Sequence, residues 1–374
     1  MNQLSKILTI TCLIISIAQG QTVETLVSGG NFNDGIALDQ LGNIYIAYYG
    51  NSNVNRVTPE GVETVFADGF SNPNGIQFDA DGNLWVPSNG SNQVYIVSPE
   101  GNSTLEIPSI GTPTGIEFDA DGNAYITQYG SNKVSRYDTE GVLEYYNEHV
   151  DLNGPVDIEV SANGTIYIAN YNDGRIFRVH QNSGQLIEVA DIPGSLGFTT
   201  LVGDVIYATG ITTNIIYAID IIAGGYTNFA GTGSAGSANG SLEEATFNGP
   251  NGIAATPDGD TLYISDYNTR NLRRIVGINS ATDVDDKSFI EPDFKLEPNY
   301  PNPFNPSTTI GYTLPENGSV LITILNSKGQ RVDYSYNPLQ NAGSYDYNFD
   351  GSGLSSGVYI YQIRTRDQIS QGKM

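Results

Sequence analysis

Short apolar segments alternate with turns rich in Gly, Asn and Asp along residues 22–278. In one stretch, the apolar segments fall at 75–79, 84–87, 93–97 and 103–107, and the dipeptide Asp81-Gly82 stands between the first two. Segments this short, separated by such turns, predict β-strands joined by hairpins. Each such stretch therefore predicts one small sheet of four strands.

An internal repeat decides the predicted fold. Residues 75–86 align without a gap with residues 115–126, and one aromatic residue marks the second strand of each unit. These aromatic residues are Tyr45, Trp85, Tyr125, Tyr167, Tyr207 and Tyr263. Their spacing is close to 40 residues except for one insertion before the last unit, and the fifth unit diverges most. Six four-stranded units predict an all-β fold with a six-bladed β-propeller at residues 21–278.

The two ends of the repeat region predict how the ring closes. The sixth unit has strands at 252–256, 262–266 and 271–276 and then runs into a polar segment without a fourth strand. The segment 23–27 is a spare strand that resembles the fourth strand of the first unit, 62–66. We therefore expect residues 22–28 to complete the sixth blade, which also removes an exposed sheet edge.

The N-terminus predicts export. Lys6 precedes a mostly apolar run, and Ala18-Gln19-Gly20 has the small residues that a signal peptidase recognises, so residues 1–20 are a predicted signal peptide with cleavage before Gln21. The run is too short for a stable membrane span, and Cys12, the only cysteine, lies inside it. The mature chain therefore has no disulfide, no thiol nucleophile and no membrane span.

Charge excludes some partners. The formal net charge of -25 opposes binding to nucleic acid or to an anionic membrane surface. The acidity suits solubility, a saline habitat or divalent cations.

The C-terminal segment predicts a second domain. A polar, acidic linker spans 279–292, and residues 293–374 show alternating apolar strands with Gly and Pro turns, which predicts a small Ig-like β-sandwich. Its motifs include Leu296-Glu-Pro-Asn-Tyr-Pro-Asn-Pro-Phe-Asn-Pro and Leu354-Ser-Ser-Gly-Val-Tyr-Ile-Tyr. They resemble the C-terminal sorting domain of type IX secretion cargo. The resemblance implies interaction with the type IX secretion machinery, passage through the periplasm, and a secreted or cell-surface location.

The propeller repeats also resemble known families. Residues 229–236, 245–254 and 262–268 resemble an NHL repeat, and the units beginning at Pro73 and Pro113 resemble streptogramin B lyase and the regucalcin–gluconolactonase family. In the gluconolactonase family a metal is held by an acidic residue before Gly and by Asn in Pro-Asn-Gly. Pro73-Asn74-Gly75 and Pro250-Asn251-Gly252 match the second pattern, whereas Asn33-Asp34-Gly35 has Asp in place of the usual Glu.

Two columns of residues are expected near one mouth of the central channel. Ring closure brings Asn251, Asp34 and Asn74 side by side, and with Asp266 they offer the oxygen ligands that calcium or another divalent cation prefers. The alternative is that Asn and Asp before Gly are turn residues. The ends of the second strands supply further candidates for a ligand-binding funnel, namely Tyr48, Ser88, Gln128 and Asn170.

A third set, Tyr49, Tyr129, Tyr171 and Tyr267, follows the second strands directly. A tyrosine presents an apolar face and a polar tip, which suits a sugar or a peptide, but these rings could also wedge between blades. His149 and His180 match no catalytic motif, so catalytic residues are not assigned. The segments 79–82 and 119–122 resemble the start of a calcium loop but return at once to an apolar strand, which predicts a hairpin.

Three functions remain open on the sequence. The first is a secreted propeller that binds a glycan, a peptide, a small molecule or a protein at the central funnel. The second is a metal-dependent lactonase, hydrolase or lyase of the gluconolactonase or streptogramin lyase type, in which a cation polarises a carbonyl. The third is a structural role at the cell surface. The fold cannot choose among them, because propellers host many functions.

Overall fold

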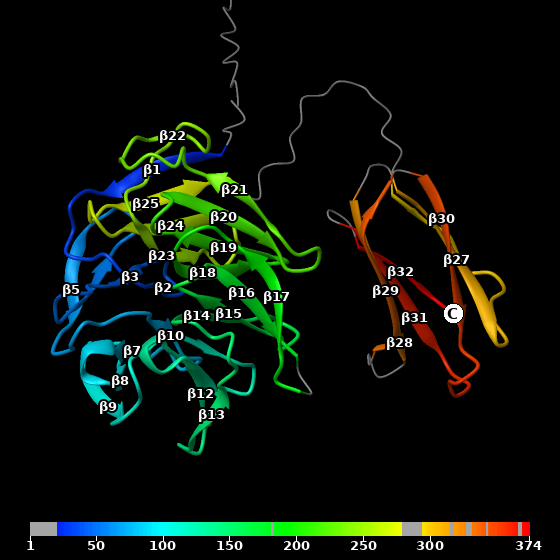
Figure 1. Cartoon of the computed structure of the whole chain (residues 1–374), viewed down its shortest axis with the longest axis horizontal. Coiled ribbons are helices and arrows are strands. Elements are labelled where there is room, and N and C mark those ends of the chain that lie inside the picture. The colour runs from blue at the N-terminus through cyan, green and yellow to red at the C-terminus, as the bar shows by residue number, and fades with distance from the viewer. Residues whose placement is uncertain are drawn as a thin grey trace, which may run out of the picture. The chain divides into compact units, whose positions relative to one another are not determined.

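A computed structural model of the chain describes residues 21–180, 183–278, 294–314, 318–326, 331–341, 343–365 and 369–374. The chain divides into two compact units, residues 1–284 and 285–374 (Figure 1). The predicted signal peptide (1–20) and linker (279–292) lie outside the described residues.

The first unit is a six-bladed β-propeller with one antiparallel sheet for each repeat, as predicted. Blade 1 contains β2 (Ile36–Leu38), β3 (Ile44–Ala47), β4 (Val54–Val57) and β5 (Glu63–Ala67). Blade 2 contains β6 (Gln77–Phe78), β7 (Leu84–Ser88), β8 (Gln93–Val97) and β9 (Ser103–Ile107). Blade 3 contains β10 (Pro113–Phe118), β11 (Ala124–Gln128), β12 (Lys133–Tyr137) and β13 (Leu143–Asn147).

The remaining blades follow the same order. Blade 4 contains β14 (Pro155–Val160), β15 (Ile166–Asn170), β16 (Arg175–Val179) and β17 (Leu186–Asp191). Blade 5 contains β18 (Leu196–Val202), β19 (Val205–Gly210), β20 (Ile215–Asp220) and β21 (Tyr226–Ala230). Blade 6 contains β23 (Pro250–Ala255), β24 (Thr261–Asp266), β25 (Leu272–Val276), β1 (Thr22–Val27) and β22 (Gly240–Ser241). The first strands of neighbouring blades pack against one another, so they surround the axis.

The second strand of each blade explains why the repeat is so apolar. All residues of β3, β7, β11 and β15 are buried, because each sheet lies between two neighbouring sheets. The hairpin before β7 uses Asp79, whose carboxylate accepts hydrogen bonds from the Asn83 backbone N–H (2.8 Å) and from Trp85 Nε1 (3.0 Å). Gly82 has a φ of +81°, which the turn requires. The acidic segment 79–82 is thus a hairpin.

The N-terminal strand closes the ring. β1 pairs antiparallel with β25, with Thr22 opposite Val276 and Val23 opposite Ile275. Val23 is 1% exposed, and Glu24 forms an ion pair with Arg274 at 2.7 Å. The predicted ring closure is therefore confirmed.

The insertion before the last blade covers this closing strand. Its short strand β22 pairs with β1 and adds a fifth strand to blade 6, which the sequence did not predict. Arg273, fully buried, donates to the carbonyl oxygens of Thr246 (2.7 Å) and Ala238 (2.9 Å) within the insertion. The insertion is thereby tied to the core of the blade.

The second unit is a small β-sandwich, as predicted. One sheet contains β26 (Lys295–Leu296), β27 (Ser307–Leu314) and β30 (Gly343–Asp350). The other contains β29 (Arg331–Gln340), β28 (Gly318–Asn326), β31 (Tyr359–Arg364) and β32 (Ile369–Lys373). Alternate residues of β27 are buried, and Ile310 shares one core with Ile322 and Ile363 from the other sheet.

Candidate functional site

The loops before the first strands and after the second strands meet at one end of the propeller. The backbone N–H groups of Tyr129, Tyr171 and Tyr267 donate to carbonyl oxygens just before the innermost strands of the same blades, at distances of 2.8–3.0 Å. These bonds fix each tyrosine beside the start of an innermost strand. We call this end of the channel the tyrosine mouth, formed by Tyr49, Tyr129, Tyr171 and Tyr267.

Tyrosines from four different blades gather at this mouth. The rings of Tyr129 and Tyr171 form an edge-to-face pair with centroids 5.6 Å apart. Burial raises the pKa of Tyr49, and nearby Asp34, Tyr267, Tyr129 and Tyr171 raise it further, so these groups lie within electrostatic reach of one another. Tyr267 keeps 40% exposure. The tyrosines thus border the mouth and remain partly open to solvent.

The predicted cation ligands are partly brought together. Asn251 Nδ2 donates to Asp34 Oδ2 at 3.1 Å, and Asp34 Oδ1 accepts the Gly35 backbone N–H at 2.9 Å. Burial raises the pKa of Asp34 to about 8, although both hydrogen bonds favour the carboxylate. Asn74 belongs to the adjoining blade, and its buried Oδ1 has no hydrogen-bond partner.

Asp266 has partners of its own within blade 6. It is fully buried in an ion pair with Arg273 (3.5 Å), and it accepts the Asn248 backbone N–H (3.2 Å) and Thr269 Oγ1 (3.4 Å). Burial raises its pKa to about 6, while these hydrogen bonds and Arg273 act against that shift. Its carboxylate is occupied within blade 6, so we leave it out of the proposed site.

The second predicted column holds the loops in place. Ser88 Oγ accepts the Ser71 backbone N–H at 2.8 Å, and Gln128 Oε1 accepts that of Gly111 at 3.1 Å. Asn170 Nδ2 donates to the Asp151 carbonyl oxygen at 2.9 Å. Ser88, Gln128 and Asn170 are at most 3% exposed, so the structure does not bring these side chains into an open funnel. Tyr48 accepts a hydrogen bond from Arg270 at 3.1 Å.

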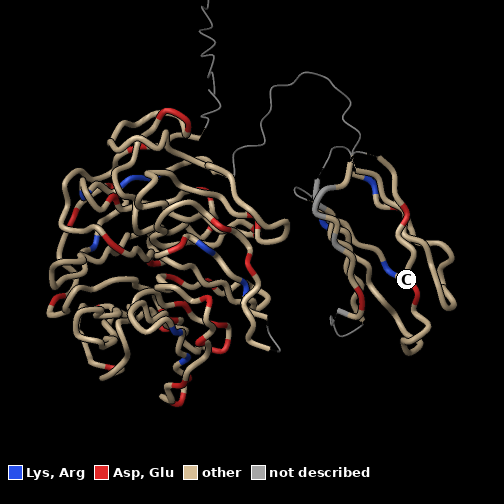
Figure 2. Tube along the Cα trace, in the orientation of Figure 1, with Lys and Arg blue, Asp and Glu red and all other residues tan. Residues whose placement is uncertain are grey.

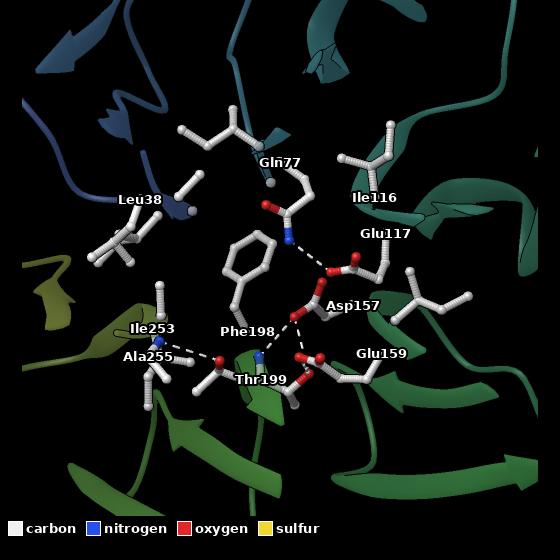
Figure 3. Close-up of a pocket in the computed structure, with 18 of the residues that line it drawn as sticks. Leu38, Gln77, Ile116, Glu117, Asp157, Glu159, Phe198, Thr199, Ile253 and Ala255 are labelled. Atoms are coloured by element: carbon white, nitrogen blue, oxygen red, sulfur yellow. Dashed lines mark hydrogen bonds between the residues drawn. The ribbon is translucent and has the colours of Figure 1, made fainter. Parts of the chain in front are cut away.

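A cavity of about 180 Å³ lies along the axis beyond the tyrosine mouth (Figure 3). None of Asp34, Asn74 or Asn251 lines it. The ring of Phe198, from blade 5, occupies the centre of the six innermost strands. A Cβ atom added to Gly75, in the opposite blade 2, would lie 2.8 Å from Phe198 Cε1, so the ring reaches across the axis. We call this space the axial cavity.

Carboxyl groups from blades 3 and 4 line one side of the axial cavity. Glu117 Oε2 accepts Gln77 Nε2 at 2.7 Å, and Asp157 Oδ2 accepts the Thr199 backbone N–H at 2.7 Å. Thr199 Oγ1 lies 3.0 Å from Asp157 Oδ2 and 3.1 Å from Glu159 Oε1. The repeat pattern does not predict this cluster, because the fifth unit, which supplies Thr199, diverges most from the others.

A signal for this cluster was present in the repeat. The pairing of Leu196 with Gly210 matches that of Pro113 with Gln128, so Phe198 is equivalent to Gly115. Four blades have Gly at this position, whereas blades 4 and 5 have Asp157 and Phe198. Residues such as Asp157 and Phe198, which replace the repeated Gly in an innermost strand, therefore mark positions whose role differs from that in the other blades.

Histidines and metal clusters do not contribute to either region. His149 lies in a loop 3.3 Å from Asp151, and the exposed His180 contacts Ser183 at 3.0 Å. Within the described residues, no three His, Cys, Asp or Glu side chains are arranged to hold a metal ion. Asp and Glu residues occur throughout both units, whereas Lys and Arg are few (Figure 2). Helices long and apolar enough to cross a membrane are absent from the part of the chain that the structure describes.

Comparison with known proteins supports this organisation. A family model described as "Secretion system C-terminal sorting domain" matches residues 299–374. The search of curated proteins gave no match. A streptogramin B lyase structure shares 17% identity over 68% of this chain and 97% of that chain, with a TM-score of 0.52.

Two further solved structures have the same fold. A gluconolactonase from Xanthomonas campestris shares 15% identity over 68% of this chain and 89% of its own, with a TM-score of 0.56. An auxiliary nutrient binding protein from Bacteroides thetaiotaomicron VPI-5482 shares 18% identity over 68% of this chain and 76% of its own, with a TM-score of 0.60. The chain is thus a secreted or cell-surface protein with a type IX secretion sorting domain, and its propeller has the fold of the streptogramin lyase and gluconolactonase-like proteins.

Proposed function

We propose that this protein is an exported binding propeller whose tyrosine mouth holds a carbohydrate outside the cell. The observation that supports it is the convergence of four tyrosines, from blades 1, 3, 4 and 6, at one end of the channel. Tyrosine faces offer a stacking surface for a sugar ring, and their hydroxyls offer hydrogen bonds at its edge. The nutrient binding proteins that share the fold make a binding role reasonable.

Glycan-array screening of residues 21–374, followed by calorimetry with the best ligand, tests this function. Tyr171→Ala should weaken binding about fivefold to thirtyfold, which corresponds to about 1–2 kcal/mol for one lost stacking contact. Tyr267→Ala should do the same. Tyr226→Ala is the matched control, because Tyr226 is also 40% exposed but lies on outer strand β21.

The location of the binding site and the class of its ligand can be tested separately. If Tyr171→Ala and Tyr226→Ala bind the ligand equally well, the mouth is not the binding site. If the array is negative while a peptide library yields a ligand that depends on Tyr171, the site stands and the ligand class changes to peptide.

A second candidate function, a calcium-dependent lactonase, hydrolase or lyase, is favoured by one observation. Asn74 Oδ1 is buried without a donor beside the blade that carries Asp34, and such an oxygen fits a hard cation. Asp34 and Asn74 would hold the ion, which would polarise a substrate carbonyl. Asn251 fits less well, because it directs Nδ2 rather than its oxygen to Asp34.

Calcium added to chelated protein tests this candidate. Binding should raise the melting temperature by linkage, and Asp34→Asn should abolish the shift. The affinity should rise with pH because the cation must displace the proton from Asp34. An unchanged melting temperature at millimolar calcium would rule out a calcium site. A lactone screen would then distinguish an enzyme from a binding protein.

A further inference from the structure

The axial cavity has two unlike walls. At one level of the innermost strands, blades 2, 3 and 4 carry Gln77, Glu117 and Glu159, whereas blades 5, 6 and 1 carry Thr200, Ala254 and Ala37. Glu117, Asp157 and Glu159 lie together on one side of the Phe198 ring (Figure 3). The cavity volume of about 180 Å³ exceeds several times the roughly 30 Å³ that one water occupies in the liquid.

The acidic wall has only neutral hydrogen-bond donors: Gln77 Nε2 donates to Glu117, and the backbone N–H and hydroxyl of Thr199 serve Asp157 and Glu159. Thr199 Oγ1 lies within hydrogen-bond distance of both Asp157 and Glu159, but a hydroxyl has one proton and can serve only one of them. Asp157 is 7% exposed, and its Oδ1 lies beside Gly115 without a donor from any side chain. The backbone N–H of Ile158 also favours the charged form of Asp157. None of these donors carries a charge, so a cationic donor that enters the cavity would supply a stronger hydrogen bond than the protein itself provides there.

The acidic wall also lacks a counter-charge. Among the residues that line the axial cavity, Glu117, Asp157 and Glu159 are titratable and none is basic. Burial and the neighbouring carboxyl groups raise the pKa of Glu159 well above its ordinary value and that of Asp157 to about 7. The proximity of three acidic groups in one cavity therefore favours their protonated forms, and a bound cation would favour their charged forms.

A single metal ion does not match this arrangement. The described carboxyl groups do not gather around one point as metal ligands would. An ammonium group, in contrast, directs three N–H donors to separate acceptors. The lining also includes the polar residues Gln77, Thr199 and Thr200. Ile116, Ile158 and the ring of Phe198 supply an apolar surface that suits an alkyl chain.

We propose that the axial cavity is a second ligand site, which binds a small primary amine with its ammonium group at Asp157 and Glu159 and its alkyl part against Phe198.

Calorimetry with butylammonium chloride on residues 21–374 tests this site. Butan-1-ol, which has the same chain without the charge, and NaCl at equal ionic strength are the probe controls. Butylammonium should bind, and binding should release protons, so the measured heat should change between buffers of different ionisation enthalpy. Glu159→Gln and Asp157→Asn should each weaken binding about tenfold to hundredfold.

Matched variants keep the test decisive. Glu188 lies in the same blade, exposed on outer strand β17, so the Glu188→Gln variant should bind butylammonium as the wild type does. Tyr171→Ala should also leave amine binding unchanged, so failure of this site and failure of the tyrosine mouth are distinguishable. Fluorescence melting of Trp85 shows whether each variant folds, and Glu117→Gln is an alternative variant if Asp157→Asn does not fold.

Three results would overturn the proposal. The first is that butylammonium binds no better than NaCl does. The second is that butan-1-ol binds as well as butylammonium, and the third is that folded Glu159→Gln binds butylammonium as well as the wild type does.

Discussion

Ring closure by β1 predicts that a small change at Val23 destabilises the whole propeller. Val23→Ala removes two buried methyl groups, which are worth about 1.6 kcal/mol in transfer from water. A residual cavity of several tens of Å³ adds about 1 kcal/mol. Because Val23 is 1% exposed and packs with Ile275, little relaxation is available, and we expect a loss of roughly 2–3 kcal/mol.

Urea unfolding followed by tryptophan fluorescence is the assay. Trp85 is the only tryptophan in the chain, and it lies on β7 in blade 2, so its signal reports the propeller and not the sorting domain. The midpoint for Val23→Ala should fall by on the order of 1 M urea. Val62→Ala is the control, because Val62 is 59% exposed and loses the same atoms, with an expected change of about 0.5 kcal/mol or less.

The same experiment tests whether the ring is one cooperative unit. A change at blade 6 can reach Trp85 in blade 2 only if the blades unfold together. If the Trp85 midpoint for Val23→Ala equals that of the wild type, the closing strand does not support the ring as argued here. If circular dichroism shows an early loss of structure that Trp85 does not sense, the blades unfold independently.

Three other predictions concern buried groups. Because the folded-state pKa of Asp157 is raised from 3.8 to about 7, its contribution to stability is present below pH 4 and is lost as the pH rises through 7. Asp157→Asn should flatten this decline in urea titrations at pH 4–8. The contribution at stake is on the order of 4 kcal/mol, and an equal decline in both proteins would contradict it. Phe198→Ala should cost about 3–5 kcal/mol, since its ring occupies the axis; a loss below 1 kcal/mol would mean that the ring packs loosely. Arg273→Met leaves Asp266 buried without its partner and should cost about 3–5 kcal/mol in the same assay, whereas Asp266→Asn combined with Arg273→Met should recover part of that loss.

The sequence predicts the propeller well because its repeat carries the same physical features six times. In blades 1 to 3 the aromatic marker also donates a hydrogen bond to the Asp of the hairpin before it, as Trp85 does to Asp79 and Tyr125 does to Asp119. The pairing of β1 with β25 could also be predicted, because a blade with three strands and a spare strand elsewhere allow one solution. The two-residue strand β22 could not, since Gly240–Ser241 has no apolar pattern.

The candidate sites were less accessible to sequence reasoning, because a position in a repeat does not reveal where a side chain turns. Asp34 and Asp266 both stand near the mouth in sequence register, yet Asp266 bonds with Arg273, a residue whose burial the sequence does not show. The axial cavity depends on Phe198 and Asp157 in the blades that depart most from the repeat. Their positions became clear only when the strand pairing aligned the fifth blade.

The closing contact joins the two ends of the propeller, with Glu24 and Arg274 separated by 250 positions. For a chain that is exported N-terminus first, β1 reaches the far side of the membrane while β25 is still on the near side. The last blade of such a chain therefore cannot be completed until nearly all of the propeller has crossed.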